Sequence, residues 1–154
     1  DVVIVPIGGG SGVCGTCIVT KSVSPDTQVI GVQSSSAPGA YRSWKEGKIV
    51  KAKVETVAEG LATGTGFNLT QLIMRDMMDD FILVSEEELD AAVVLHLQKT
   101  HNLTEHAGAA SLAAALKIKD RLQGKKVVLV LSGGNITVDQ LRLSLERREN
   151  MGMA

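Results

Sequence analysis

The sequence lacks a membrane-spanning run, a disulfide framework and an excess of either charge. No apolar run approaches the roughly 20 residues that a transmembrane helix requires, and no basic-then-apolar secretory segment precedes the first apolar run. Sixteen Lys and Arg residues against 17 Asp and Glu residues give a net charge of -1. The sequence therefore has no excess of positive charge that would attract nucleic acid or anionic lipid. We therefore expect a cytoplasmic protein with no nucleic acid and no membrane among its partners.

Cysteine and histidine are too few and too scattered for a metal site. Cys14 and Cys17 are expected to be reduced thiols. Their C-x-x-C spacing at a helix start is also typical of a redox pair, but we favour two small buried side chains, because a redox pair needs exposure. His96, His101 and His106 are five residues apart, which points them in different directions on a helix, so we expect surface or locally bonded histidines and no metal.

What the sequence does contain is the pattern of one α/β domain. Of its 154 residues 44% are hydrophobic and 21% charged, as in a globular protein. Apolar runs of strand length alternate with segments of helical period, which predicts a mainly parallel, twisted sheet with helices on both faces. We expect the domain to occupy residues 1–148 and a tail residues 149–154. Because Asp1 directly precedes a strand, we also expect the chain to be part of a longer polypeptide.

Local signals predict where the elements begin and end. Ser36 is expected to cap a short helix, and Ser85 with Glu88 and Thr137 with Gln140 form capping boxes. Strands are expected at residues 2–5, 28–33, 81–84 and 126–131, and helices at 12–22, 36–44, 69–78, 86–100 and 107–122 and after 137. The stretch 47–66 should be irregular, with one short strand near 49–54, and irregular chain of this length tends to be functional.

The first predicted strand leads into a glycine-rich turn, with Gly8, Gly9, Gly10 and Gly12 around Ser11. Such a turn can surround a phosphate with backbone N–H groups, and the helix that follows adds its positive N-terminus. The alternative is a tight connection without a ligand. The turn lacks the third glycine of a dinucleotide fingerprint and the lysine of a Walker loop.

The last predicted strand ends in a similar turn, Ser132-Gly133-Gly134-Asn135. A serine hydroxyl there can bond a ring nitrogen, although an ordinary strand-to-helix turn would look the same. The carboxyl ends of parallel strands share one edge of the sheet, so the two turns are candidates for one pocket wall. Glu59 and Glu105 either line that pocket or are solvated carboxylates.

Together these residues resemble the C-terminal half of a fold type II pyridoxal-phosphate enzyme of the serine/threonine dehydratase (threonine deaminase) family. The blocks that carry the resemblance span almost the entire chain: Val5-Pro6-Ile7-Gly8-Gly9-Gly10-Ser11-Gly12, Ile30-Gly31-Val32-Gln33, Ala58-Glu59-Gly60-Leu61-Ala62, Val84-Ser85-Glu86-Glu87-Glu88 and Leu131-Ser132-Gly133-Gly134-Asn135.

The resemblance implies a function and a cofactor. The complete protein would be an ammonia-lyase that converts L-threonine or L-serine, a small hydroxy-amino acid, to a 2-oxo acid and ammonia. The site residues implied for pyridoxal phosphate are Gly8, Gly9, Gly10, Ser11 and Gly12, which would hold the phosphate, and Ser132, which would bond the pyridine nitrogen.

The chain also departs from the family pattern. The block with the cofactor-binding lysine lies N-terminal to the glycine turn in the family, and no lysine here matches it, so no catalytic residue is assigned and the isolated chain is expected to be inactive. Gln33 and Gly39 stand where some relatives have cation-binding acids, so we expect no metal. Only a helix and a short tail follow Asn135, so we expect no amino-acid-sensing regulatory domain.

Two other readings of the chain stay open. One is a truncated relative that serves as a cofactor-binding, anion-binding or structural module, and the other is a redox domain built on Cys14 and Cys17. Within the family, dehydratase and racemase share this half and cannot be separated. We expect the chain to pair either with copies of itself or with the N-terminal part, because a sheet edge would otherwise face water.

Overall fold

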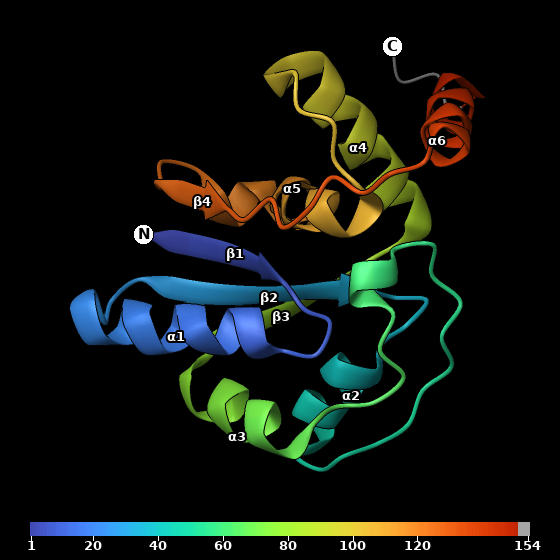
Figure 1. Ribbon diagram of the computed structural model, residues 1–154. Helices are drawn as coiled ribbons and strands as arrows, with labels where there is room; N and C mark the ends of the chain where they lie inside the picture. Colours follow the sequence, from blue (N-terminus) through green and yellow to red (C-terminus); the bar gives the residue numbers. More distant parts are fainter. Residues whose placement is uncertain (151–154) are drawn as a thin grey trace.

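The computed structural model describes residues 1–150, with side chains through 148 (Figure 1). The expected tail at 149–154 begins inside the last helix, and its residues 151–154 lie outside the described part. The elements in chain order are β1 (Val2–Pro6), α1 (Ser11–Val23), β2 (Gln28–Ser34), α2 (Gly39–Glu46), the 3₁₀ helix η1 (Glu59–Leu61), α3 (Asn68–Met77), β3 (Asp80–Val84), α4 (Glu86–Thr100), α5 (His106–Lys117), the 3₁₀ helix η2 (Lys119–Leu122), β4 (Val127–Leu129) and α6 (Val138–Asn150).

The four strands form one parallel sheet in the order β3-β2-β1-β4. This is the expected α/β architecture, with α1, α2 and α3 on one face and α4, α5 and α6 on the other (Figure 1). Because all strands point the same way, their carboxyl ends lie at one edge, where the connecting segments gather.

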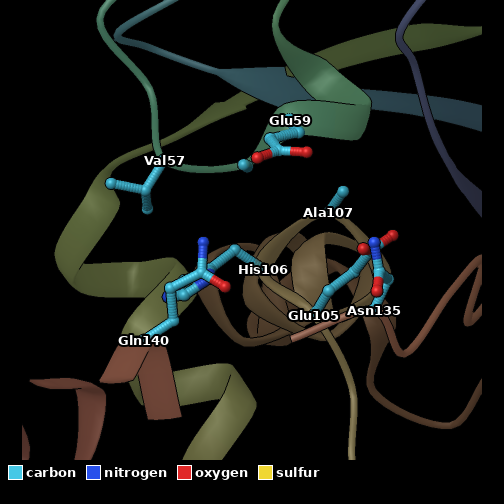
Figure 2. A pocket seen from close by; sticks show the side chains of 8 residues that line it. Val57, Glu59, Glu105, His106, Ala107, Asn135 and Gln140 are labelled. Carbon is cyan, nitrogen blue, oxygen red and sulfur yellow. The ribbon is translucent and has the colours of Figure 1, made fainter. Parts of the chain in front are cut away.

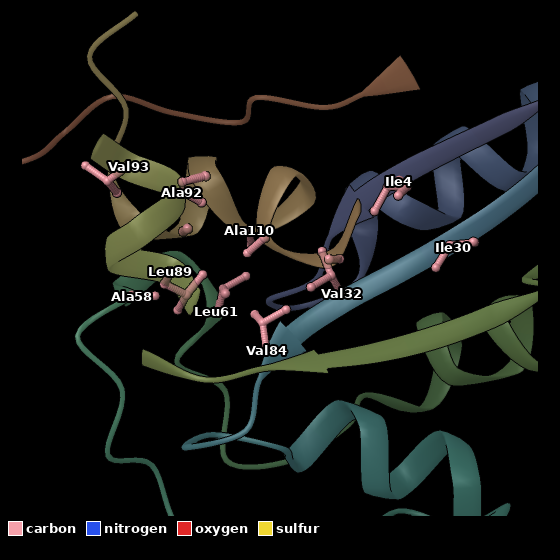
Figure 3. Packing of buried hydrophobic residues seen from close by; sticks show 14 of the residues in the cluster. Ile4, Ile30, Val32, Ala58, Leu61, Val84, Leu89, Ala92, Val93 and Ala110 are labelled. Carbon is pink, nitrogen blue, oxygen red and sulfur yellow. The ribbon is translucent and has the colours of Figure 1, made fainter. Parts of the chain in front are cut away.

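Each face of the sheet has its own hydrophobic core, and successive residues of β1 alternate between the two. Val2 and Ile4 pack under α4 and α5, while Val3 and Val5 pack under α1 and α3. Figure 3 shows the first of these cores, where the alanines of α5 let that helix lie close to the strands. The alternation is the period of two that a strand imposes.

Several expected details are wrong. Pro38 occupies the N-cap position of α2 in place of Ser36, no strand forms at 49–54, and the described chain there has only an isolated bridge between Lys51 and Thr65. β4 ends at Leu129, and α5 ends at Lys117 before η2.

The apolar residues at helical spacing in α3 predict a buried face of Leu69, Leu72, Ile73 and Met77, but only Ile73 and Met77 pack against the core. Leu69 and Leu72 are 70% and 64% exposed, whereas Gln71 and Met74 are buried. Gln71 turns inward because its Nε2 donates to the carbonyl of Ala40 (3.0 Å), which ties α3 to α2.

None of the helices in the described chain has both the length and the apolar character needed to cross a membrane.

Candidate functional site

The two glycine-rich turns follow neighbouring strands at the same edge of the sheet. β1 and β4 pair in parallel, with Ile4 opposite Leu129, and the amide of Val130 donates to the carbonyl of Ile4 (3.0 Å). The hydroxyl of Ser111 on α5 donates to the carbonyls of Ile4 (3.0 Å) and Val130 (2.9 Å), just before both turns. The structure thus brings the first turn and the Ser132 turn to one side of the molecule.

In the first turn the described chain binds the carbonyls of Gly8, Gly9 and Gly10 but not their amides. The hydroxyl of Thr63 donates to the carbonyl of Gly8 (3.1 Å), that of Thr70 to the carbonyl of Gly9 (3.0 Å), and the Cys14 amide to the carbonyl of Gly10 (3.0 Å). Among the described residues, the amides of Gly8, Gly9 and Gly10 donate to no protein acceptor. The turn therefore has several free N–H donors and occupied carbonyls.

The N-terminus of α1 is also uncapped. Gly10 precedes the helix at φ 94°, no side chain caps it, and the first turn contains no acidic residue. Ser11 is exposed, so its hydroxyl can add a donor. Free backbone amides, the helix dipole and a hydroxyl are the donor set that phosphate prefers. The residues present therefore fit a phosphate group.

The glycines of this turn serve different purposes. A Cβ on Gly8 would lie 2.3 Å from the carbonyl oxygen of Gly60, and Gly10 has the positive φ that other residues avoid. A Cβ on Gly12 would meet nothing within 4 Å. Gly8 and Gly10 are thus explained by the fold itself, while Gly12 borders open space at the helix N-terminus.

Glu105 connects the Ser132 turn to η1. Its Oε1 is 2.4 Å from where a Cβ of Gly133 would be and 3.9 Å from that of Gly60. Its amide donates to the carbonyl of Gly133 (3.3 Å), and Ser132 itself is exposed. Since Gly60 also touches Gly8, the two turns are linked through Gly60 and Glu105.

A pocket lies beside the Ser132 turn, between η1, the start of α5 and α6 (Figure 2). Glu59 and Glu105 both line it, so the carboxylates that the sequence left open share one cavity. Its other walls are Val57, Ala58, His106, Ala107, Asn135 and Gln140.

The redox reading of Cys14 and Cys17 is wrong. Both thiols are buried, and Cys14 Sγ donates to the carbonyl of Thr70 (3.5 Å). Burial, followed by the neighbouring Cys14, raises the pKa of Cys17 to about 11, and burial also raises the pKa of Cys14. A reactive thiol needs a lowered pKa, so these cysteines pack the core under α1.

Gln33 is satisfied entirely by its neighbours. Its Nε2 donates to Thr63 Oγ1 (3.0 Å) and to the carbonyl of Leu61 (3.4 Å), and its Oε1 accepts from the Tyr41 amide (3.0 Å). Across the described chain, no three His, Cys, Asp or Glu side chains are placed to share a metal ion.

Some residues that shape this edge of the sheet carry no signal in the sequence. Thr63 and Thr70 had no recognisable motif, since a single threonine in a loop or helix gives no signal of what it bonds. The expectation of surface or locally bonded histidines holds for His96, which contacts Thr100 on its own helix, but is wrong for His106. His106 is 3% exposed and bonds residues of two other helices, a long-range contact that spacing cannot reveal.

Known proteins are similar to this chain in both sequence and fold. The chain is 40% identical over 146 residues to an L-threonine ammonia-lyase of Geobacter sulfurreducens, covering 94% of this chain and 36% of that protein. It is 38% identical over 146 residues to a serine racemase of Dictyostelium discoideum, covering 92% of this chain and 45% of that protein. The chain thus spans less than half the length of these relatives.

The structure of the processed form of threonine deaminase isoform 2 from Solanum lycopersicum superposes with a TM-score of 0.89 at 28% identity, over 95% of this chain and 43% of that one. The family model described as pyridoxal-phosphate dependent enzyme matches residues 1–133. The chain therefore belongs to the family of pyridoxal-phosphate dependent enzymes and has the fold of the fold type II members.

Proposed function

We propose that this chain forms the phosphate-binding and ring-nitrogen-binding side of the cofactor site in a cytoplasmic ammonia-lyase that acts on L-threonine or L-serine. The observation that carries the proposal is the first turn, where the carbonyls of Gly8, Gly9 and Gly10 accept hydrogen bonds while their amides donate to no acceptor in the described part of the chain. The similarity to an L-threonine ammonia-lyase supports the reaction class.

The first turn would hold the cofactor phosphate. The free amides of Gly8, Gly9 and Gly10, the uncapped start of α1 and the Ser11 hydroxyl give neutral donors around an anion. Thr63 and Thr70 keep the carbonyl dipoles turned away, so they do not repel the phosphate.

Ser132 would bond the pyridine nitrogen from the neighbouring strand. When bound, pyridoxal phosphate supplies an electron sink for negative charge at the substrate α-carbon. A serine hydroxyl, unlike a carboxylate, does not favour a proton on the ring nitrogen, so it limits how strongly that charge is stabilised. A limited electron sink favours loss of the β-hydroxyl as water over slower reactions that also begin from negative charge at the α-carbon.

The rest of the reaction would depend on polypeptide beyond this chain. No lysine here matches the family's cofactor-binding block, so the residues of this chain bind and orient, and the base comes from elsewhere. We infer that the chain alone is inactive and that the complete enzyme pairs this half with an N-terminal half.

The test is a charge reversal at Gly12, where a side chain has room. A carboxylate in the first turn of α1 interacts favourably with the helix dipole and stabilises the helix by about 0.3–1 kcal/mol. Gly12→Asp should therefore fold at least as well as the wild type. It should nevertheless bind pyridoxal phosphate at least tenfold more weakly by calorimetry, because it repels the phosphate.

Gly12→Asn is the matched control, since it has nearly the same shape without the charge. We expect this variant to retain most of the affinity. Equal affinity of the Asp and Asn variants, or no binding by the wild-type chain, would refute a phosphate site at this turn.

A further inference from the structure

A buried polar network joins α4, α5 and α6 behind the pocket. His106 Nε2 is 3.0 Å from Asp90 Oδ1 and 3.1 Å from Ser144 Oγ. Ser144 Oγ donates to Asp90 Oδ1 (2.6 Å), and Arg147 Nη1 donates to Asp90 Oδ2 (2.8 Å). Asp90, His106 and Ser144 are each at most 3% exposed. The cofactor site described above uses none of these four side chains.

The network fixes which nitrogen of His106 holds the proton. The Asp90 carboxylate only accepts hydrogen bonds, and the Ser144 hydrogen is directed to Asp90 or to the Gln140 carbonyl (3.1 Å). Both neighbours of Nε2 are therefore acceptors, so Nε2 must be the donor. The neutral ring then has an unprotonated Nδ1.

Nδ1 is the ring nitrogen of His106 that the network does not use. In the described chain Nδ1 makes no hydrogen bond. It is also not a fully buried atom, so a small group can reach it. His106 lines the pocket together with Glu59 and Glu105 (Figure 2), and it also borders a neighbouring pocket with Asp90 and Arg147. Free space there admits about one water-sized group.

We propose that this pocket is a subsite for an ammonium group, in which His106 Nδ1 accepts a hydrogen bond and Glu59 and Glu105 supply the opposite charge. An ammonium ion, or the end of a small primary amine, has the size, the charge and the N–H donors that these walls complement. Asp90 and Ser144 hold the ring so that Nδ1 remains an acceptor. Ammonium binding in this pocket would require no bound cofactor.

Charges around His106 come from every element packed against it. Asp90 on α4 and Arg147 on α6 pair with each other and border a neighbouring pocket with His106, while Glu105 precedes His106 and Glu59 lies on η1. The carboxylates on the pocket side have no cationic partner among the described ion pairs. A cation in the pocket would supply that partner.

The experiment is ¹⁵N NMR of histidine-labelled chain at about pH 8, where imidazole is neutral in ordinary proteins. Only three histidines are present, so His96→Gln and His101→Gln assign the spectrum. We expect His106 to be the Nε2–H tautomer and its Nδ1 resonance to move saturably with ammonium chloride. Tetramethylammonium chloride, which has the charge but no N–H, should leave it unmoved, and His96 should respond to neither salt.

Variants separate the pocket from the network. Glu105→Gln should weaken the ammonium response roughly fivefold, since it removes one charge from the wall. Asp90→Asn should lower the tautomer ratio about tenfold, and Ser144→Ala, which keeps the buried charge paired with Arg147, should lower it less. An Nδ1–H tautomer, an absent ammonium response, or an equal response to tetramethylammonium would overturn the proposal.

Methylammonium distinguishes the two ammonium sources. A response to ammonium alone supports the free ion as the occupant, and an equal response to methylammonium supports the end of a primary amine.

Discussion

At the scale of single residues, the glycines of the first turn look alike in the sequence but are constrained differently. Gly8 contacts the backbone of Gly60, which cannot move without shifting η1, whereas Gly12 faces open space. A run of glycines therefore combines positions that the fold requires with positions that leave room for a ligand.

Gly8→Ala should lower the free energy of unfolding by about 1–3 kcal/mol, because its methyl group would overlap the Gly60 carbonyl. Gly12→Ala should leave the stability unchanged or raise it slightly, since alanine is the better helix former. Urea denaturation followed by circular dichroism measures both. Equal effects of the two substitutions would contradict this assignment of roles.

The ionisation of Asp90 should make the free energy of unfolding depend on pH in the acidic range. Burial alone would raise its pKa, but hydrogen bonds from His106, Ser144 and Arg147 outweigh burial and lower the pKa to about 2 from the ordinary 3.8. A carboxyl with a lowered folded-state pKa stabilises the fold above its unfolded pKa and loses that contribution as the pH falls through the folded pKa. The contribution is about 2 kcal/mol.

The free energy of unfolding should thus decline between about pH 4 and pH 2, and Asp90→Asn should be less stable at neutral pH and show a smaller decline. Denaturation curves at a series of pH values test this. A variant with the wild-type pH dependence would show that Asp90 is not the group responsible.

At the scale of elements, the helix ends that depend on local hydrogen bonds were predictable. Ser85 and Glu88 form the expected reciprocal capping box, and Thr137 and Gln140 form another. The strands and the sheet type also follow from their apolar runs. Ser36 fails as a cap because the chain before α2 is held by tertiary contacts, including a bond from the Glu55 amide to the Ser36 carbonyl (2.8 Å).

Ser85→Ala should therefore cost about 1 kcal/mol of stability, the usual value for an N-cap. Ser36→Ala is the matched control, and we expect it to be nearly neutral because the Ser36 hydroxyl makes no hydrogen bond in the described chain. Thermal unfolding of the two variants measures the difference. A Ser36 variant as destabilised as the Ser85 variant would contradict the observed caps.

The candidate site was predictable in part for the same reason. The two turns could be placed at one edge because parallel strands dictate it. The network of Asp90, His106, Ser144 and Arg147 could not, since its members come from three helices whose packing no local pattern encodes.

At the scale of the whole molecule, the sheet ends at β4, whose Val128 is 57% exposed. Leu131, just beyond it, is 41% exposed. An uncovered edge strand with apolar side chains tends to pair with another chain. We propose that another copy of the chain, or another polypeptide segment, covers this edge.

The isolated chain should accordingly self-associate as its concentration rises, as measured by size exclusion with light scattering. Val128→Lys places a charge on the edge and should shift the population toward monomer. A wild-type chain that stays monomeric at high concentration would show that the β4 edge does not pair with another chain.

In the proposed site, the turns at residues 8–12 and 132–135 hold opposite ends of one cofactor. The most direct test of this arrangement is a titration of the ¹⁵N-labelled chain with pyridoxal phosphate, followed by the amide resonances of both turns. We expect the amide resonances of Gly9, Gly12, Ser132 and Gly134 all to shift with one shared dissociation constant. Shifts confined to a single turn, or different constants for the two, would contradict it.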